Sequence, residues 1–356
     1  MIQPWNASRR GSVGRRPSGR VTVRQVAAAS GYSVGTVSRA MSGHPAVAPA
    51  TRDEILAVAA RLGAPVGNGA AAVRGPAPDA PVLVRCPYVL DDYFGRVVTA
   101  AVETLAVHGR RAVLDTGETA RERPVLAGLA RDRELAGAVL VLPPEPVREL
   151  EALRTSRFPF VVVDPMTTLP ADVPSVSAAH LTSARALTAH LLELGHRRIG
   201  VVGGPTEWLA SRSRLAGHAS ALADAGLLPD PSLRRSVRPT ADDGYRAACE
   251  LLDEPGPGGA PTALVAFNDK VASGVLRAAA ERGLAVPGDL SVTGFDDLDL
   301  ARSTVPALTT AHQPLEEMGR MAVSLLLRLI ARQAVDALHV SLATELVVRG
   351  STASPK

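Results

Sequence analysis

Side chains that commonly do catalytic chemistry are present in this sequence, but they form no catalytic pattern. The eight histidines lack the spacing of metal ligands, and the chain has no HExxH, no serine nucleophile elbow and no P-loop. Asp296, Asp297 and Asp299 could suggest a metal site, but carboxylates grouped in this way are more often residues of a loop or cleft. We therefore expect a protein that is not an enzyme, with no catalytic residue, no metal and no cofactor.

Arginine is the other chemically useful side chain, and it is unevenly distributed. Residues 1–75 contain ten arginines against Asp53 and Glu54, a net charge of +8, whereas the rest of the chain has 29 basic and 33 acidic residues, a net charge of −4. Guanidinium groups make bidentate contacts to phosphate and to guanine. This division of charge predicts a nucleic-acid-binding N-terminal region on a more acidic body.

Helix-start and helix-stop residues near the N-terminus predict a pair of short helices. Thr22, with a glutamine three residues later, fits a capping box that starts a helix at residues 23–30. Gly31 can adopt the left-handed backbone that ends a helix, and Ser33 is placed to cap a second helix at residues 34–42. Two short helices joined by a glycine-containing turn form a helix-turn-helix, which indicates double-stranded DNA as a partner.

A third helix at residues 49–62 would close a small core against this pair, because its apolar residues recur at helical spacing. The predicted core residues are Val26, Ala27, Tyr32, Val37, Met41, Ile55, Val58, Ala59 and Leu62. The residues left facing outward near the start of the second helix are Val34, Gly35, Ser38 and Arg39. This is the part of a helix-turn-helix that enters a major groove.

From residue 81 onward, short apolar runs alternate with helical stretches. The predicted strands are residues 82–85, 111–115, 137–142, 160–164, 199–203, 262–267 and 290–295. The predicted helices are residues 94–108, 121–135, 181–194, 211–225, 241–252, 270–282 and 315–332. Such alternation implies parallel sheets covered on both faces, and there are enough units for two Rossmann-like subdomains with ligand at the carboxyl ends of the strands.

The segment VTVRQVAAASGYSVGTVSRAMSGHPAVAPATRDEILAVAARLG resembles the DNA-binding head of the LacI/GalR (lactose-repressor) family. The resemblance implies that Val34 and Gly35 stand at the pair of positions that read bases, and that Arg39 contacts a base. The other DNA-binding positions it implies are Thr22, Ser33, Thr36 and Ser38. Because Gly35 has no side chain, we expect base reading to depend on Val34 and Arg39.

Two further N-terminal segments are interpreted beside this head. Residues 1–20 are expected to form a disordered basic arm, which could add phosphate contacts; a solvated tail or an early start codon is the alternative. Residues 64–80 correspond to the family's hinge, which folds on the operator and pushes a leucine into the minor groove. Val73 stands at the position of that leucine and would be a shorter wedge.

The body resembles the effector domain of the same family, a fold shared with periplasmic sugar-binding proteins. The resemblance covers nearly all of residues 81–352 and is carried by segments such as HLLELGHRRIGVVGGP, PTALVAFNDKVASGVLRAAAERGLAVPGDLSVTGFDDLDLA and TELVVRGST. It implies an effector site formed by Trp208, Arg214, Asn268, Asp269 and Asp296, with Trp208 and Phe267 able to stack on a sugar ring. The chain departs from the family at Ala179–His180 and at residues 91–94.

The predicted organisation is therefore an N-terminal all-α helix-turn-helix head, residues 21–63, on an α/β periplasmic-binding-protein-like body of two Rossmann-like subdomains. The N-subdomain is expected at residues 81–163 plus 314–337, and the C-subdomain at residues 164–313 plus 338–352.

The predicted function is sequence-specific transcriptional repression by a cytoplasmic homodimer on a pseudo-palindromic operator. A small-molecule effector, a sugar or related metabolite, would control it from between the subdomains. No membrane partner is expected, because the chain has no apolar run long enough to span a bilayer. An exported solute-binding protein is the second hypothesis, but it would need a signal peptide and no helix-turn-helix. A regulator that has lost ligand control is the third.

Overall fold

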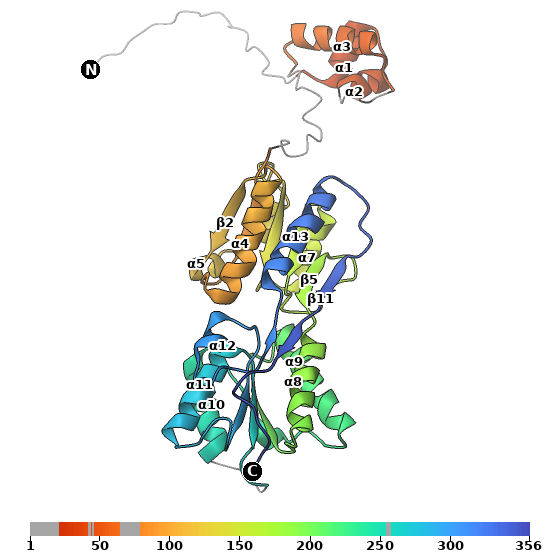
Figure 1. Ribbon diagram of the computed structural model, residues 1–356. Helices are drawn as coiled ribbons and strands as arrows, with labels where there is room; N and C mark the ends of the chain where they lie inside the picture. The colour runs from red at the N-terminus through yellow and green to blue at the C-terminus, as the bar shows by residue number, and fades with distance from the viewer. Residues whose placement is uncertain (1–20, 42–43, 45, 65–78, 254–257) are drawn as a thin grey trace, which may run out of the picture. The chain divides into compact units, whose positions relative to one another are not determined.

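The computed structural model describes residues 21–41, 44, 46–64, 79–253 and 258–356. The chain forms two compact units, Met1–Gly75 and Pro76–Lys356, which we call the head and the body (Figure 1). The predicted arm at residues 1–20 and Val73 lie outside the described residues, as do residues 65–78 of the predicted hinge. Among the described helices, none combines the length and the apolar character that crossing a membrane requires.

The head contains the three predicted helices, α1 (Val23–Ser30), α2 (Val34–Met41) and α3 (Pro49–Arg61). The capping box at Thr22 is confirmed, because its hydroxyl accepts from the backbone of the third helical residue, whose side chain accepts from the backbone of Thr22. Gly31 ends α1 with φ of 76°, in the left-handed region that favours glycine. Local capping chemistry therefore determines where α1 begins and ends.

The core of the head consists of the faces that the three helices turn toward one another. Its buried members are Val26, Ala27, Val37, Ala40, Val47, Ile55, Ala59 and Ala64. The prediction of Leu62 as a core residue was wrong, since its side chain is 41% exposed. The physical reason is that α3 ends at Arg61, so Leu62 is the C-cap and leaves the buried stripe, while Ala64 beyond it turns back into the core.

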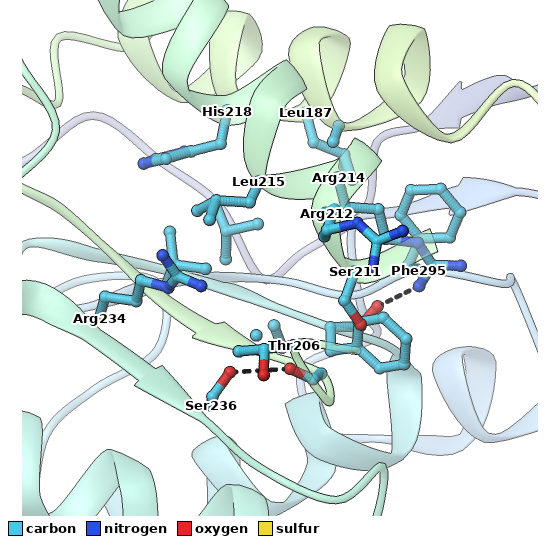
Figure 2. Close-up of a pocket in the computed structure, with 17 residues that line it drawn as sticks. Leu187, Thr206, Ser211, Arg212, Arg214, Leu215, His218, Arg234, Ser236 and Phe295 are labelled. Carbon is cyan, nitrogen blue, oxygen red and sulfur yellow. Dashed lines mark hydrogen bonds between the residues drawn. The ribbon is translucent and has the colours of Figure 1, made fainter. Parts of the chain in front are cut away.

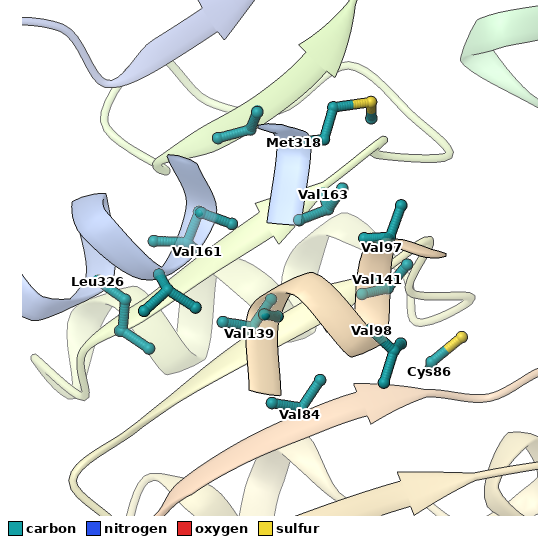
Figure 3. Packing of buried hydrophobic residues seen from close by; sticks show 14 of the residues in the cluster. Val84, Cys86, Val97, Val98, Val139, Val141, Val161, Val163, Met318 and Leu326 are labelled. Carbon is teal, nitrogen blue, oxygen red and sulfur yellow. The ribbon is translucent and has the colours of Figure 1, made fainter. Parts of the chain in front are cut away.

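The first part of the body is a parallel six-stranded sheet in the order β11-β5-β4-β3-β1-β2. Its strands are β1 (Val82–Cys86), β2 (Ala112–Thr116), β3 (Gly137–Val141), β4 (Phe160–Val163), β5 (Ser175–Ala178) and β11 (His339–Leu342). Helices α4 (Asp92–Val107) and α13 (Leu315–Ile330) pack on one face through the cluster drawn in Figure 3. Helices α5 (Glu118–Glu122), α6 (Leu126–Leu129) and α7 (Val147–Thr155) complete this N-subdomain, with α6 and α7 on the opposite face.

The second part is a parallel four-stranded sheet in the order β7-β6-β8-β9. Its strands are β6 (Ile199–Gly203), β7 (Arg234–Ser236), β8 (Ala263–Ala266) and β9 (Ser291–Thr293). Helices α8 (His180–Glu193) and α9 (Leu209–Asp224) cover one face, and α10 (Ala241–Asp253) and α11 (Asp269–Glu281) the other. The remaining elements of this C-subdomain are η1 (Pro231–Leu233), α12 (Asp299–Ser303) and the antiparallel pair β10 (Thr310–His312) and β12 (Glu345–Val347).

Two predictions about the body were wrong. The helix expected at residues 121–135 is replaced by α5 and α6, because Pro124 lacks a backbone donor and its ring clashes with a continuing helix. The subdomain boundaries also differ, since β5 pairs with β4, and β11 pairs with β5, in the sheet of the N-subdomain. The chain therefore leaves the N-subdomain after β5 rather than at residue 163, and its return for α13 extends through β11 rather than ending at residue 337.

Candidate functional sites

α2 and its N-cap carry an exposed surface made of Ser33, Val34, Gly35, Ser38 and Arg39. The Ser33 hydroxyl accepts from the Thr36 backbone N–H at 3.1 Å and lies 2.9 Å from the Thr36 hydroxyl, so it caps the helix as predicted. Val34 is 48% exposed although it is apolar, and Gly35 and Ser38 are also exposed. The exposed Arg39 donates from Nε to the Gly35 carbonyl at 3.1 Å. One helix thus carries every outward residue that the sequence predicted for base reading.

Thr22 lies at the start of α1, where its groups are engaged with Gln25. Its backbone N–H donates to Gln25 Oε1 at 2.7 Å, and its hydroxyl donates to the same oxygen at 3.0 Å. Helix N-termini attract phosphate, because their first N–H groups have no intrahelical acceptor. The position of Thr22 is therefore compatible with the DNA contact that the family resemblance implied.

The body encloses a cavity of about 150 Å³ whose walls come from both subdomains; we call it the effector cavity. It combines four aromatic side chains with carboxylates, an amide, an arginine and a lysine. The lining residues are Asp91, Tyr93, Phe94, Leu142, Asp164, Trp208, Ala210, Arg214, Pro239, Phe267, Asn268, Lys270, Asp296 and Leu298. Four of the five predicted effector residues are among them, and the fifth, Asp269, is not.

Arg214 is held firmly in the wall of the effector cavity. One of its terminal nitrogens donates to the Phe267 carbonyl at 2.5 Å, and the other lies 3.6 Å from the Asp296 carboxylate. The guanidinium carbon is 3.6 Å from the centroid of the Phe295 ring, a cation–π distance. Burial lowers the pKa of Arg214, while Asp296 and Asp164 oppose the shift. The side chain is therefore a preorganised cation with carboxylates nearby.

Asp164 is a cavity residue that sequence reasoning missed. Its carboxylate accepts from the Tyr93 hydroxyl and lies 3.1 Å from His180 Nε2. The other ring nitrogen of His180, Nδ1, is 3.4 Å from a terminal nitrogen of Arg214. Burial raises the pKa of Asp164, but His180, Tyr93 and Arg214 outweigh it and lower the pKa below its ordinary value.

The sequence did contain a signal for Tyr93 and His180, the two residues that contact Asp164. Both occupy segments in which this chain departs from the family's residues, at 91–94 and at Ala179–His180. The structure brings these two departures together on one carboxylate, Asp164. No single stretch of sequence could have revealed that contact, because Tyr93 and Asp164 are 71 residues apart.

Asp296 faces Arg214 from the loop that follows β9. Its carboxylate accepts from the Gln313 side chain at 2.6 Å, and burial raises its pKa to about 6 against the opposing effects of Arg214 and Gln313. The backbone at Asp296 has φ of 106°, which is strained for a residue with a side chain. Such strain is common at binding sites, where surrounding structure holds a side chain in a demanding orientation.

Asn268 and Asp269 have different positions although they are neighbours. Asn268 lines the cavity and caps α11, accepting from the Val271 N–H at 3.0 Å. Asp269 is 0% exposed, and its two oxygens accept from the Leu298 N–H at 2.8 Å and the Thr310 hydroxyl at 2.7 Å. Burial, reinforced by Asp296, raises the pKa of Asp269 to about 8. Asp269 thus braces the loops behind the cavity, contrary to its predicted place on the lining.

Trp208 lies at the N-cap of α9 and at the edge of the cavity, as predicted for a side chain that could stack on a ligand. Its ring meets the Phe267 ring edge-on, with centroids 6.1 Å apart. Across the cavity, Phe94 stacks on Tyr88 with centroids 4.7 Å apart. In the part of the chain that the structure describes, no group of three or more histidines, cysteines or carboxylates could hold a metal ion.

An exposed helix-turn-helix, together with a two-subdomain body around a cavity of aromatic and charged side chains, defines a ligand-responsive DNA-binding regulator. Residues 22–63 match the family model "Bacterial regulatory proteins, lacI family", and residues 188–352 match "Periplasmic binding protein-like domain". The chain is 32% identical to the transcriptional repressor CytR of Escherichia coli K12, over 93% of this chain and 96% of the relative. The chain belongs to the LacI family of transcriptional regulators, which are not enzymes.

Solved structures agree with this assignment. The CelR–cellobiose complex is 30% identical to this chain with a TM-score of 0.69, and the match covers 93% of this chain and 100% of that chain. The lac repressor dimer bound to operator and the anti-inducer ONPF has 26% identity and a TM-score of 0.68, covering 94% and 100%. The predicted head-and-body architecture is therefore confirmed.

Proposed function

We propose that this regulator reads a pseudo-palindromic operator as a homodimer, with α2 of each head in a major groove. Val34 would contact a thymine methyl group and Arg39 would contact guanine, while Thr22, Ser33, Thr36 and Ser38 position the helix on the backbone. Gly35 leaves the second base-reading position without a side chain. Two-fold symmetry in the protein then corresponds to two-fold symmetry in the operator.

A second copy of the chain could pair with the N-subdomain along β2, which is the edge strand of its sheet. Val113 and Leu114 are exposed on this strand, and Val107 is exposed at the end of α4. An edge strand with apolar side chains is a surface that favours pairing with another chain. Leu114→Glu should shift the dimer toward monomer in sedimentation velocity, whereas Leu228→Glu, at an exposed site on the C-subdomain, should not.

The effector is proposed to be a sugar or a related metabolite that binds in the effector cavity. The observation that carries this proposal is the pairing of aromatic faces with buried charged groups: Trp208 and Phe267 offer flat surfaces, and Asp164 and Asp296 offer acceptors. Carboxylates accept from hydroxyl groups, and Arg214 donates to ring or hydroxyl oxygens. The CelR relative, whose structure contains cellobiose, gives this class of ligand additional support.

The effector would control DNA binding because the wall of its cavity is formed by residues of both subdomains. Two ion pairs also join the subdomains near the cavity, Asp91 with Lys270 and Arg96 with Asp299, the second at 2.8 Å. A ligand that draws the subdomains together changes their relative pose and hence the spacing of the heads, with a coupling of roughly 1 to 3 kcal/mol. The regulator would bind both its operator and its effector in the cytoplasm.

A thermal-shift screen of the purified protein with sugars, nucleosides and related metabolites tests this proposal. A binder should raise the melting temperature and change operator affinity in an anisotropy titration. A binder that stabilises the protein without changing operator affinity would argue against control through the cavity. A screen without any binder, combined with intact operator binding, would favour a regulator that acts without ligand.

A further inference from the structure

A second hollow lies inside the C-subdomain, between α9 and the sheet formed by β6, β7 and β8; we call it the side chamber. It measures about 40 Å³, and one water needs roughly 10–15 Å³ by this measure, so it accommodates a few waters or one small group. Arg214 and Phe267 line both this chamber and the effector cavity, so the two spaces share a wall.

The wall of the chamber is mostly apolar, but its polar side chains are arginines, hydroxyl groups and one histidine, and no aspartate or glutamate is among its lining residues. Its cations are Arg212, Arg214 and Arg234, and its hydroxyl groups belong to Thr206, Ser211 and Ser236 (Figure 2). Among the residues that the structure describes, neither Arg212 nor Arg234 forms an ion pair with a carboxylate. Burial lowers the pKa of the lining His218 to about 4, so His218 is neutral near pH 7.

Two buried polar atoms at the chamber have no partner in the structure. Ser211 is 9% exposed and its hydroxyl makes no hydrogen bond, and the Nε of Arg214 likewise makes none. Ser211 and Arg214 are three residues apart on α9, so they share one face of the helix. An unsatisfied buried donor is costly, and acceptor oxygens of a bound group would satisfy these two donors.

The backbone around the chamber also favours negative charge. β6 ends at Gly203, and Gly204 begins the loop that leads into α9. The first backbone hydrogen bond of α9 runs from the Arg212 N–H to the Trp208 carbonyl, at 3.1 Å. Of the N–H groups that precede Arg212 in the helix, that of Leu209 donates to the Met166 carbonyl at 2.7 Å, while those of Ala210 and Ser211 have no intrahelical acceptor, and the positive end of the helix dipole adds to their effect. A Cβ atom at Gly204 would come within 2.7 Å of the Phe267 ring and of the Ser211 hydroxyl, so glycine preserves the space.

We propose that the side chamber is an oxyanion subsite that binds a phosphate or carboxylate group through Ser211, Arg214 and Arg234. Because the chamber shares Arg214 and Phe267 with the effector cavity, the anionic group can be free in solution or carried by an effector. In the second case the inference rests on the proposed effector site and narrows its ligand to an anionic metabolite.

The test is isothermal titration calorimetry of the full chain with inorganic phosphate, at constant ionic strength and pH 7. Saturable binding is expected, and Ser211→Ala and Arg234→Gln should each weaken it by roughly tenfold or more, as the loss of a hydrogen bond to a charged group does. The matched controls are Ser213→Ala on the same helix and Arg238→Gln, an exposed arginine beyond β7. Neither control residue lines the chamber, so both variants should bind as the wild type does.

Glucose and glucose 6-phosphate distinguish the two sources of the anion. Tighter binding of the phosphate ester, lost in Ser211→Ala, would identify a group carried by the effector; binding of inorganic phosphate alone would identify a free anion. The proposal would be overturned if neither inorganic phosphate nor glucose 6-phosphate bound through the chamber. Equal losses of phosphate affinity in Arg234→Gln and Arg238→Gln would also overturn it. These titrations measure anion binding without operator DNA and without any effector response. The proposed control of DNA binding could therefore fail while the oxyanion subsite is confirmed, and the subsite could fail while the control is confirmed.

Discussion

The α2 surface of the head and the effector cavity of the body are built in opposite ways. Apart from Thr22, the residues proposed to contact DNA lie within seven consecutive positions, from Ser33 to Arg39, and several contact one another directly. The effector cavity gathers side chains from position 91 to position 298, and its central contacts join residues of different helices and loops. A surface on one helix is therefore robust to changes elsewhere, whereas a gathered cavity depends on every element that contributes to it.

The sharpest test of this contrast is Asp296→Ala, which should abolish the effector response and leave operator binding intact. The change removes the carboxylate nearest to Arg214 and leaves the Gln313 donor without its acceptor. We expect at least a 100-fold loss of effector affinity, on the order of two hydrogen bonds to a charged group. Calorimetry with the effector and anisotropy with operator measure the two effects separately.

Asp242→Ala is the matched control, because Asp242 is exposed on α10 and pairs with Arg277 outside the cavity. It should change neither measurement. An unchanged effector response in Asp296→Ala would remove Asp296 from the site.

The corresponding test in the head is Arg39→Ala. Operator affinity should fall by roughly 5- to 150-fold, the effect of 1 to 3 kcal/mol of base discrimination, while affinity for random DNA falls much less. Anisotropy titrations with both DNAs at one salt concentration measure the ratio. Arg61→Ala, at the end of α3, should preserve the ratio. Equal losses on operator and random DNA would show that Arg39 contacts only phosphate.

A smaller effect should appear in the pH dependence of stability. The pKa of Asp269 is about 8 in the folded body, above its value in the unfolded chain, so its neutral form is favoured on folding. The resulting stability is complete below the unfolded pKa and is lost as pH rises toward 8, with a slope of up to about 1.4 kcal/mol per pH unit.

Chemical denaturation of the wild type and of Asp269→Asn between pH 5 and pH 8.5 checks this expectation. The Asn variant keeps a side chain of the same size, and it should flatten the pH dependence over this range. Identical slopes in the two proteins would mean that Asp269 does not titrate as its burial requires.

The smallest effect is expected from Gly35→Ala in the head. A Cβ atom there would have only ordinary contacts, 3.8 Å to the Arg39 guanidinium and 3.9 Å to the Ser33 hydroxyl. Alanine should therefore stabilise α2 by up to about 1 kcal/mol relative to glycine. Thermal unfolding of the full chain followed by circular dichroism measures this. Destabilisation instead would show that the turn into α2 needs the freedom of glycine.

How far the sequence predicts this structure differs between the two regions for a physical reason. In the head, Thr22, Gly31 and Ser33 act on backbone groups within a few residues, so helix ends and exposed faces could be predicted from local pattern. In the body, all seven predicted strands are present, but the long helix across Pro124 was wrong, and β5 and β11 were assigned to the other subdomain. Strand pairing between distant segments leaves no local signal.

The sequence by itself determined the charged head, its three helices, the alternating strands and helices of the body and four of the five residues expected at the cavity. Only the tertiary structure decided that Tyr93 and His180 converge on Asp164 and that Asp269 lies behind the cavity. It also decided that Ser211 and Arg214, each with an unpaired buried atom, line a second chamber. The reason is that burial, pKa and the pairing of polar atoms depend on what distant segments place nearby, while helix caps depend only on neighbours along the chain.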